Sequence, residues 1–331
     1  MVQYAAGVRK GLEFGASPRR WFPVFLVDAL FFLLLVGMMG TNRTLLPSLV
    51  QAAQASLPLT PLAYAFLGSA ALLGLAWFLI RAYVVGALIH QARKPREFQQ
   101  SWRLARARYP SLLGSLVAVA LVSVAAGMLP FLGWMFSVLA GLAFFFSLQS
   151  VMVRKSRALP SLEDSYRLFV HSLERVATRD AAFVGWVVVV LALGFLAGLF
   201  AYASALVAGA TPLLVLGAVA GWITFSMLSF LLFFSPVFRM WLVLSVVSGM
   251  IALLFAVPAL LVGLLSLSPS LLALTGDRLV QALLLFFLGR LDVLALMGCV
   301  FLVGSAIATA FTLKAQTEYY LQLTKKRFII V

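Results

Sequence analysis

Asp28 and Arg81 are the two residues of this chain whose types and positions could support chemistry inside a membrane. Asp28 is the one acidic residue within an apolar run long enough to cross a bilayer, and it lies about 9 Å past the predicted inner end of that run. Arg81 ends the apolar core of the next predicted helix at a similar depth. Because a charge in hydrocarbon costs on the order of 3 kcal/mol or more, such groups generally find a partner or a water-filled cavity.

We therefore predict an ion pair between Asp28 and Arg81 that braces two neighbouring helices. An ion or proton pathway through the same two residues is one alternative. Independent snorkelling of each side chain to the membrane interface is the other.

The rest of the sequence offers little reactive chemistry. It has no phosphate-binding glycine loop, no paired histidine motif, no cluster of membrane carboxylates and no nucleophile with an evident base. Cys299 is the only cysteine, which excludes an intrachain disulfide or a thiolate metal site. His90 and His171 lie in basic segments and are interpreted as surface side chains. We therefore predict a protein that is not an enzyme and that holds no cofactor and no metal.

The elements that must position Asp28 and Arg81 are long apolar runs. The chain is 63% hydrophobic and 11% charged, with a mean hydropathy of +1.08, far from the averages of soluble domains. Since about 20 helical residues cross a ~30 Å hydrocarbon core, the runs predict an all-α fold, a polytopic integral membrane helical bundle of eight spans. The spans are expected at roughly 22–40, 62–83, 111–129, 132–153, 182–204, 213–235, 240–265 and 292–313.

Six spans is the alternative count. The stretch 181–267 has Arg239 as its only charge and could instead hold a re-entrant or interfacial segment. The apolar stretch 279–288 is too short to cross and is predicted to be an amphipathic helix on the outer surface.

The basic residues predict the orientation. Of the 25 Lys and Arg residues, 22 fall in 1–21, 81–110, 154–180, position 239 and 314–331. Because cytoplasmic loops collect Lys and Arg, we predict a cell-membrane protein with both termini cytoplasmic. The chain has a net charge of +15, but its basic residues flank the spans and do not form a continuous patch. Anionic lipid headgroups are therefore the expected partner, and nucleic acid is not.

The chain is predicted to be a single membrane domain, 1–331. Its expected parts are a basic amphipathic N-terminus (1–21), a first hairpin (22–90), an amphipathic helix with a second hairpin (91–153), an amphipathic helix with a third hairpin (154–238), a fourth hairpin (239–313) and a basic cytoplasmic tail (314–331).

Three cytoplasmic segments have amphipathic helical spacing. The clearest is 161–179, where Tyr166, Phe169 and Leu173 share one face. We predict that this face lies against the inner membrane surface or docks a protein partner. Weaker versions occur at 98–109, before Pro110, and at 4–13. A duplicated unit of amphipathic helix plus hairpin would explain them, and simple anchoring at lipid headgroups is the alternative.

Glycines at spacings of four predict close helix packing within the predicted spans. Gly194 and Gly198 form one such pair, and Gly217 and Gly221 form another. Without a side chain, each pair lets a neighbouring backbone approach closely.

Several short motifs resemble a known group of proteins. They are Pro18-Arg19-Arg20-Trp21, Ser101-Trp102-Arg103-Leu104, Ser165-Tyr166-Arg167-Leu168 and Gln316-Thr317-Glu318-Tyr319-Tyr320. In layout the chain resembles uncharacterised multi-pass membrane proteins common in archaea, which are similar to the membrane domain of some glycerophosphodiester phosphodiesterases. The resemblance implies six spans and no known activity.

Two functions fit these features. The first is a non-enzymatic scaffold or membrane subunit of a larger assembly with unidentified protein partners. The second is a permease subunit that moves a hydrophobic or lipid-like substrate with the help of a separate cytoplasmic partner. A packed interior would favour the first, and a cavity between the spans would favour the second.

Overall fold

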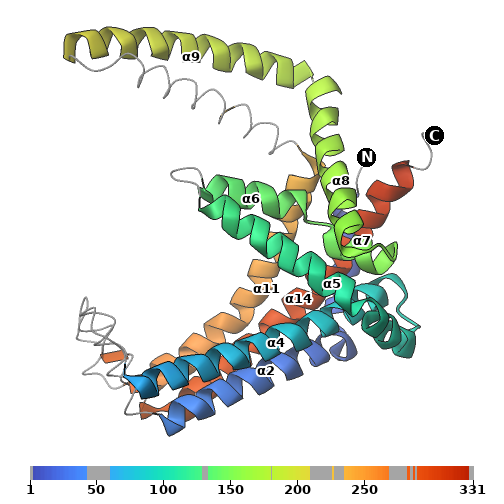
Figure 1. Cartoon of the computed structure of the whole chain (residues 1–331), viewed down its shortest axis with the longest axis vertical. Helices are drawn as coiled ribbons and strands as arrows, with labels where there is room; N and C mark the ends of the chain where they lie inside the picture. Colours follow the sequence, from blue (N-terminus) through green and yellow to red (C-terminus); the bar gives the residue numbers. More distant parts are fainter. Residues whose placement is uncertain are drawn as a thin grey trace.

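The computed structural model is all-helical throughout the residues that it describes, which are 3–42, 60–128, 133–179, 181–208, 226, 235–267, 282–283, 286–287 and 289–327. The helices of more than one turn are α1 (Tyr4–Gly15), α2 (Pro18–Thr41), α4 (Pro61–Arg93), α5 (Phe98–Gly127), α6 (Gly133–Ala143), α7 (Ser147–Val153), α8 (Ala158–Arg179), α9 (Ala181–Ala208), α11 (Pro236–Ser266) and α14 (Leu291–Arg327). This is the predicted all-α membrane bundle (Figure 1).

Six segments within the described part of the chain are long and apolar enough to cross a membrane. They are Pro18–Thr41, Pro61–Arg93, Phe98–Gly127, Phe136–Val153, Pro236–Ser266 and Leu291–Thr324. The span predicted at 182–204 coincides with α9, which projects from the end of α8 away from the other helices (Figure 1). Most of the span predicted at 213–235 and of the surface helix predicted at 279–288 lies outside the described residues.

Several helices continue past the ends that charge predicted. α4 runs ten residues beyond the expected end at 83 to Arg93, and α14 runs from Leu291 through most of the expected tail to Arg327. The predicted amphipathic segment 98–109 is the first part of α5, which continues through Pro110. Charged residues end an apolar run but not a helix, because Arg, Lys, Gln and Ala are good helix formers.

The predicted span 132–153 is interrupted. A turn at 144–146 divides it into α6 and α7. The interruption has a side-chain cause: the Ser165 hydroxyl of α8 donates to the Ala143 carbonyl (2.8 Å) and accepts from the Phe146 amide (3.0 Å). Ser165 thereby satisfies two backbone groups that a continuous helix would have paired internally.

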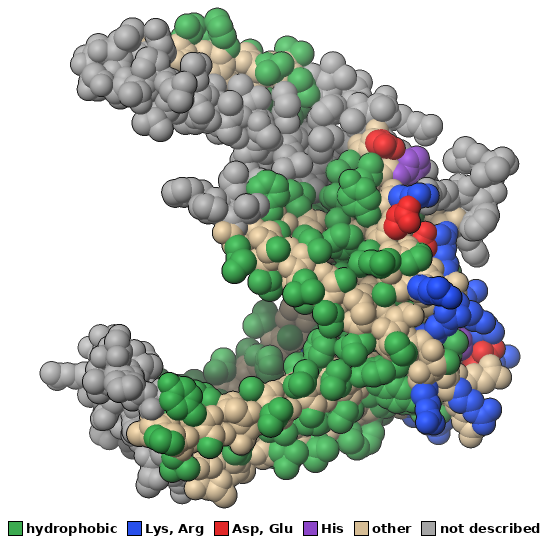
Figure 2. Space-filling model, in the orientation of Figure 1, with side chains coloured by type: hydrophobic (Ala, Val, Ile, Leu, Met, Phe, Trp, Pro, Cys, Tyr) green, Lys and Arg blue, Asp and Glu red, His purple; other side chains and the backbone are tan. Residues whose placement is uncertain are grey.

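One end of the bundle carries the charge. Figure 2 shows Lys and Arg side chains gathered on one side of the molecule, where α4 ends and α5 begins, whereas hydrophobic side chains are the main coloured type over the other described helices. We call this side the basic end, and the side where α2 ends and α14 begins the opposite end. The two ends match a helix bundle that crosses a bilayer with one strongly basic face.

The buried core lies at the basic end. Every residue of α4 from Gly86 to Ala92 is buried, so this part of the helix is surrounded on all sides. The largest fully buried side chains include Phe311, Tyr319 and Tyr320 of α14. Much of the segment expected to be a basic tail therefore belongs to the core, because Lys314 is its only basic residue before position 325 and Ala315, Thr317, Tyr319 and Tyr320 are buried.

α1 packs on α14 through glycines. Gly7, Gly11 and Gly15 are buried, whereas Leu12 is exposed. A Cβ atom at Gly7 would lie 2.3 Å from Tyr319 Cε1, and one at Gly11 would lie 2.8 Å from Phe311 Cδ2. The absence of side chains at these positions lets α1 lie directly against the aromatic rings of α14.

Candidate functional site

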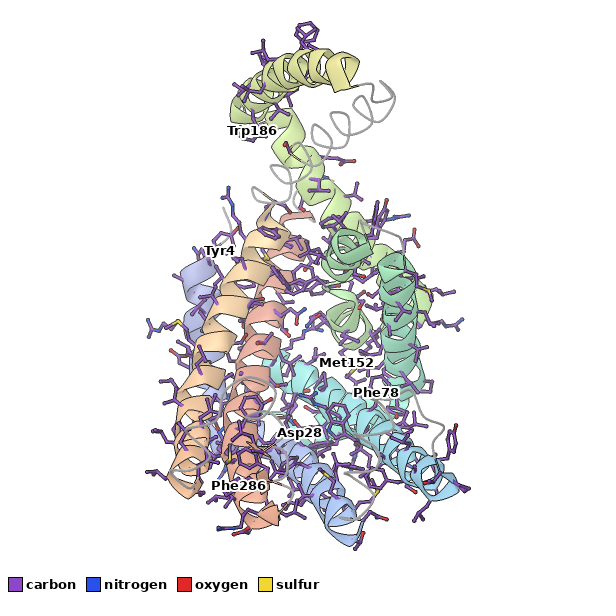
Figure 3. The ribbon with its side chains drawn as sticks, turned by 90° about the vertical axis from the view of Figure 1, so that its left-hand side faces the viewer. Tyr4, Asp28, Phe78, Met152, Trp186 and Phe286 are labelled. Carbon is purple, nitrogen blue, oxygen red and sulfur yellow. The ribbon has the colours of Figure 1, made fainter. Side chains whose placement is uncertain are left out.

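Asp28 and Arg81 lie side by side between two antiparallel helices. α2 and α4 run next to each other, with Asp28 on the face of α2 that meets α4 (Figure 3). Arg81 Nε is 3.3 Å from Asp28 Oδ1. The Asp28 side chain is 4% exposed and that of Arg81 29% exposed, so the pair is largely shielded by the protein.

Trp77 is a third member of this group, and sequence reasoning missed it. Its indole Nε1 donates a 2.8 Å hydrogen bond to Asp28 Oδ1. The Arg81 guanidinium carbon also lies 5.0 Å from the centre of the Trp77 ring, within the range of a cation–π interaction. The spacing of Trp77 and Arg81 by four residues, which places both on one helical face, was the available signal.

A cavity opens beside the pair. Its volume is about 320 Å³, and α2, α4 and α14 each contribute to its wall. The lining residues are Asp28, Phe31, Phe32, Leu35, Ala70, Leu73, Gly74, Trp77, Arg81, Leu302 and Ser305. This volume lies at the lower end of the range of small-molecule sites, roughly 300–1,000 Å³.

The cavity is amphipathic along its length. Asp28 and Arg81 lie at the side nearer the basic end, and Leu35 and Ala70 lie further along the two helices toward the opposite end. From Asp28 to Leu35 the wall extends about 10 Å, at ~1.5 Å per helical residue. Phe32 forms part of this wall and is seated where Gly298 of α14 carries no side chain, since a Cβ there would lie 2.1 Å from the Phe32 ring.

The polar side of the cavity carries no net charge. Asp28 Oδ1 is already engaged by Trp77 and Arg81, and the guanidinium balances the charge of the carboxylate, which disfavours a role for Asp28 as a general base. Arg81 Nε is buried, and neither it nor the outer guanidinium nitrogens donate a hydrogen bond to any described residue. The site therefore offers hydrogen-bond donors to a polar group and an apolar wall to a chain.

The predicted docking face of α8 is only partly available. Tyr166 is 52% exposed and Leu173 is half-buried, but Phe169 is 6% exposed and packs inside the chain. Leu168 and buried serines also lie on the inner face of α8. The hydroxyl oxygen of one of these serines, Ser172, is 2.9 Å from that of Ser235. The Tyr166 side chain lies outside the packed core, where a membrane or a protein partner can cover it.

The glycine pairs predicted for close packing are described only in part. Gly194 is buried and Gly198 half-buried on α9, whereas Gly217 and Gly221 lie outside the described residues. The helix contact that these pairs were expected to form stays a prediction.

His90 is not a surface side chain, contrary to the sequence interpretation. It is 8% exposed, and its Nδ1 lies 2.9 Å from the Ser101 hydroxyl of α5. It is buried because the end of α4 is enclosed by α5 and α7. Within the described residues, no three His, Cys, Asp or Glu side chains come together in an arrangement that could hold a metal ion.

Comparisons with protein-family models, with curated proteins and with solved structures found no match to this chain. The likeness to archaeal multi-pass membrane proteins therefore stays a prediction from short motifs.

Proposed function

We propose that this protein is a non-enzymatic membrane subunit that holds a hydrophobic, lipid-like molecule in the cavity between α2, α4 and α14. The observation that carries the proposal is the amphipathic cavity itself, with the Asp28–Arg81 pair at one side and an apolar wall beyond it. A packed bundle that served only as a scaffold would leave no such space between these helices.

The arrangement of the cavity favours a particular kind of ligand. In one leaflet of a bilayer, a lipid keeps its polar head near the membrane surface and its chain toward the centre, and the cavity has the same order. Because the ion pair has no net charge, an uncharged head with hydrogen-bond acceptors suits Arg81 better than a second anion beside Asp28. A single-chain lipid with a hydroxylated head meets these requirements.

Filling the cavity should prevent binding. Gly74 lines the cavity, and a Cβ atom there would meet no atom within 4 Å, so we expect the ring of Gly74→Phe to fill the cavity. We expect native mass spectrometry of the detergent-purified chain to detect one bound mono-olein molecule per wild-type protein and none on Gly74→Phe.

Gly68→Phe is the matched control, because Gly68 lies on the same helix, also has open space around it and does not line the cavity. It should bind mono-olein like the wild type. Equal binding by Gly74→Phe and Gly68→Phe, or no retained lipid on the wild type, would count against the proposal.

The scaffold function is the second candidate. It is favoured by exposed apolar groups on the outer face of α8, where Leu159 is 75% and Tyr166 52% exposed. Under this function the complex formed in the native membrane should keep its size on a native gel after Gly74→Phe, whereas a subunit that depends on its lipid should lose partners.

We propose that the basic end faces the cytoplasm, supported by the segregation of Lys and Arg to that end. Single-cysteine labelling tests this in a Cys299→Ala background. Glu163 is exposed on α8 near the basic end, and Thr60 is exposed at the start of α4 at the opposite end. Thr60→Cys should react with an impermeant maleimide in intact cells, and Glu163→Cys only after permeabilisation. The reverse pattern would contradict the orientation.

A further inference from the structure

A second cavity lies at the basic end, well separated along α4 from the one beside Asp28. Its volume is about 590 Å³. Its wall is formed by the end of α4, the start of α5, Met152 of α7 and Lys155 in the connection to α8. The lining residues are His90, Arg93, Lys94, Glu97, Gln100, Arg103, Leu104, Met152 and Lys155. Leu104 and Met152 provide apolar surface, and the remaining side chains are polar or charged.

The wall is strongly cationic. Four basic side chains line the cavity, namely Arg93, Lys94, Arg103 and Lys155, against the single carboxylate of Glu97. Lys94 Nζ is 2.8 Å from Glu97 Oε1, so the one acidic group is already paired. Three positive charges therefore remain without a counter-charge inside the wall.

Two of these cations also have no hydrogen-bond partner within the described part of the chain. Arg93 Nη1 donates to the Val153 carbonyl at 2.7 Å, which fixes its guanidinium at the edge of the cavity. Arg103 and Lys155, by contrast, make no ion pair or side-chain hydrogen bond with any residue that the structure describes. They approach the cavity from different segments of the chain, as the ligands of a multivalent anion do.

The backbone at Lys155 is strained. Its φ is 61°, and it is the only residue other than glycine with a positive φ in the described part of the chain. Glycine is the residue that adopts this conformation most readily after a helix end. Lysine is less favourable than glycine at this positive φ, so its presence points to a role of the ammonium group in binding.

We propose that this basic cavity binds a phosphate group, in the form of a phosphomonoester or a pyrophosphate. A tetrahedral anion with several acceptor oxygens can be contacted from α4, α5 and the α7–α8 connection at once, and the paired Glu97 adds little repulsion. The volume leaves room for the rest of a phosphorylated headgroup or small molecule. This site is independent of the lipid proposed for the cavity beside Asp28.

Calorimetric titration of the full chain in a non-ionic detergent at 0.15 M salt tests the proposal with two probes. Inorganic pyrophosphate represents a soluble phosphate compound, and dioctanoyl phosphatidic acid represents a lipid headgroup. We expect saturable binding of one molecule per chain for at least one probe. Arg103→Gln should raise the Kd about tenfold, the equivalent of one charge-assisted hydrogen bond.

Lys155→Gly separates binding from structure. It should raise the Kd to a similar extent, while the melting temperature should hold or rise, because glycine relieves the positive φ. A merely structural lysine would show the opposite, a lower melting temperature with unchanged binding.

Arg106→Gln is the charge-matched control, since Arg106 is exposed on the same helix one turn later and does not line this cavity. Its Kd should change less than about twofold, the size expected from screened long-range charge alone. Binding of pyrophosphate would assign a soluble ligand, and binding of phosphatidic acid alone would assign a lipid headgroup. No saturable binding of either probe, or equal losses in Arg103→Gln and Arg106→Gln, would overturn the proposal.

Discussion

Asp28→Asn and Arg81→Gln are each expected to destabilise the purified protein by roughly 2–3 kcal/mol. Each change leaves the other charge without its partner 3.3 Å away. Breaking a fully buried pair costs about 3–5 kcal/mol, and the 29% exposure of the Arg81 side chain lowers that figure by letting the cation find water. Thermal unfolding in detergent should show the loss as a reduced melting temperature for both variants.

The double variant distinguishes a brace from two independent charges. If the side chains stabilise each other, Asp28→Asn with Arg81→Gln should recover part of the loss, giving a coupling energy of about 1 kcal/mol or more. Losses that simply add would show that the close approach contributes nothing to stability.

An exposed ion pair provides the control. Arg290 Nη2 lies 3.1 Å from Asp292 Oδ2, a similar distance, but both side chains are more than half exposed. Asp292→Asn and Arg290→Gln should leave the melting temperature unchanged, because water and salt screen such a pair.

Gly7→Ala should destabilise the protein by about 1–3 kcal/mol, the cost of overpacking a core. The added methyl would lie 2.3 Å from the Tyr319 ring. That ring cannot swing away, because Tyr319 is fully buried and its hydroxyl donates a 3.0 Å hydrogen bond to the Tyr4 carbonyl of α1. The clash would therefore push α1 off α14, and the melting temperature should fall.

The same substitution at Gly37 should have the opposite or no effect. A Cβ atom there meets nothing within 4 Å. In a helix interior alanine is more favourable than glycine, by up to about 1 kcal/mol in water. If Gly7→Ala and Gly37→Ala shifted the melting temperature alike, α1 would not be packed on α14 as described.

Part of this architecture can be predicted from the amino-acid sequence. The apolar runs determine the membrane class and most span positions, since the length and polarity of a run follow directly from bilayer thickness. The approach of Asp28 to Arg81 could also be predicted, because two lone charges at similar depth on sequential helices have few other partners. The gathering of Lys and Arg at one end of the bundle could be predicted once the positions of the spans were known.

Other features required the tertiary structure. Residues 86–92 of α4 are buried on all sides and Tyr319 and Tyr320 of α14 lie in the core, although both segments were expected from their charges to be exposed to solvent. In a membrane an exposed apolar face can be covered by lipid, so hydrophobicity does not tell which side of a helix packs against protein. The packed faces of α8 and α1 are in fact formed by serines and by glycines, which hydrophobicity would not have selected.

The candidate sites show the same division. Trp77 could join the ion pair only once packing had set the rotation of α4 about its axis. The cavity exists because α14, from a distant part of the chain, meets α2 and α4 around Phe32 and Gly74. The basic cavity gathers Arg103 and Lys155 across more than 50 positions of sequence. Composition and span length are local properties of this chain and determined its class, whereas the faces that meet depend on packing between distant helices, which only the tertiary structure decided.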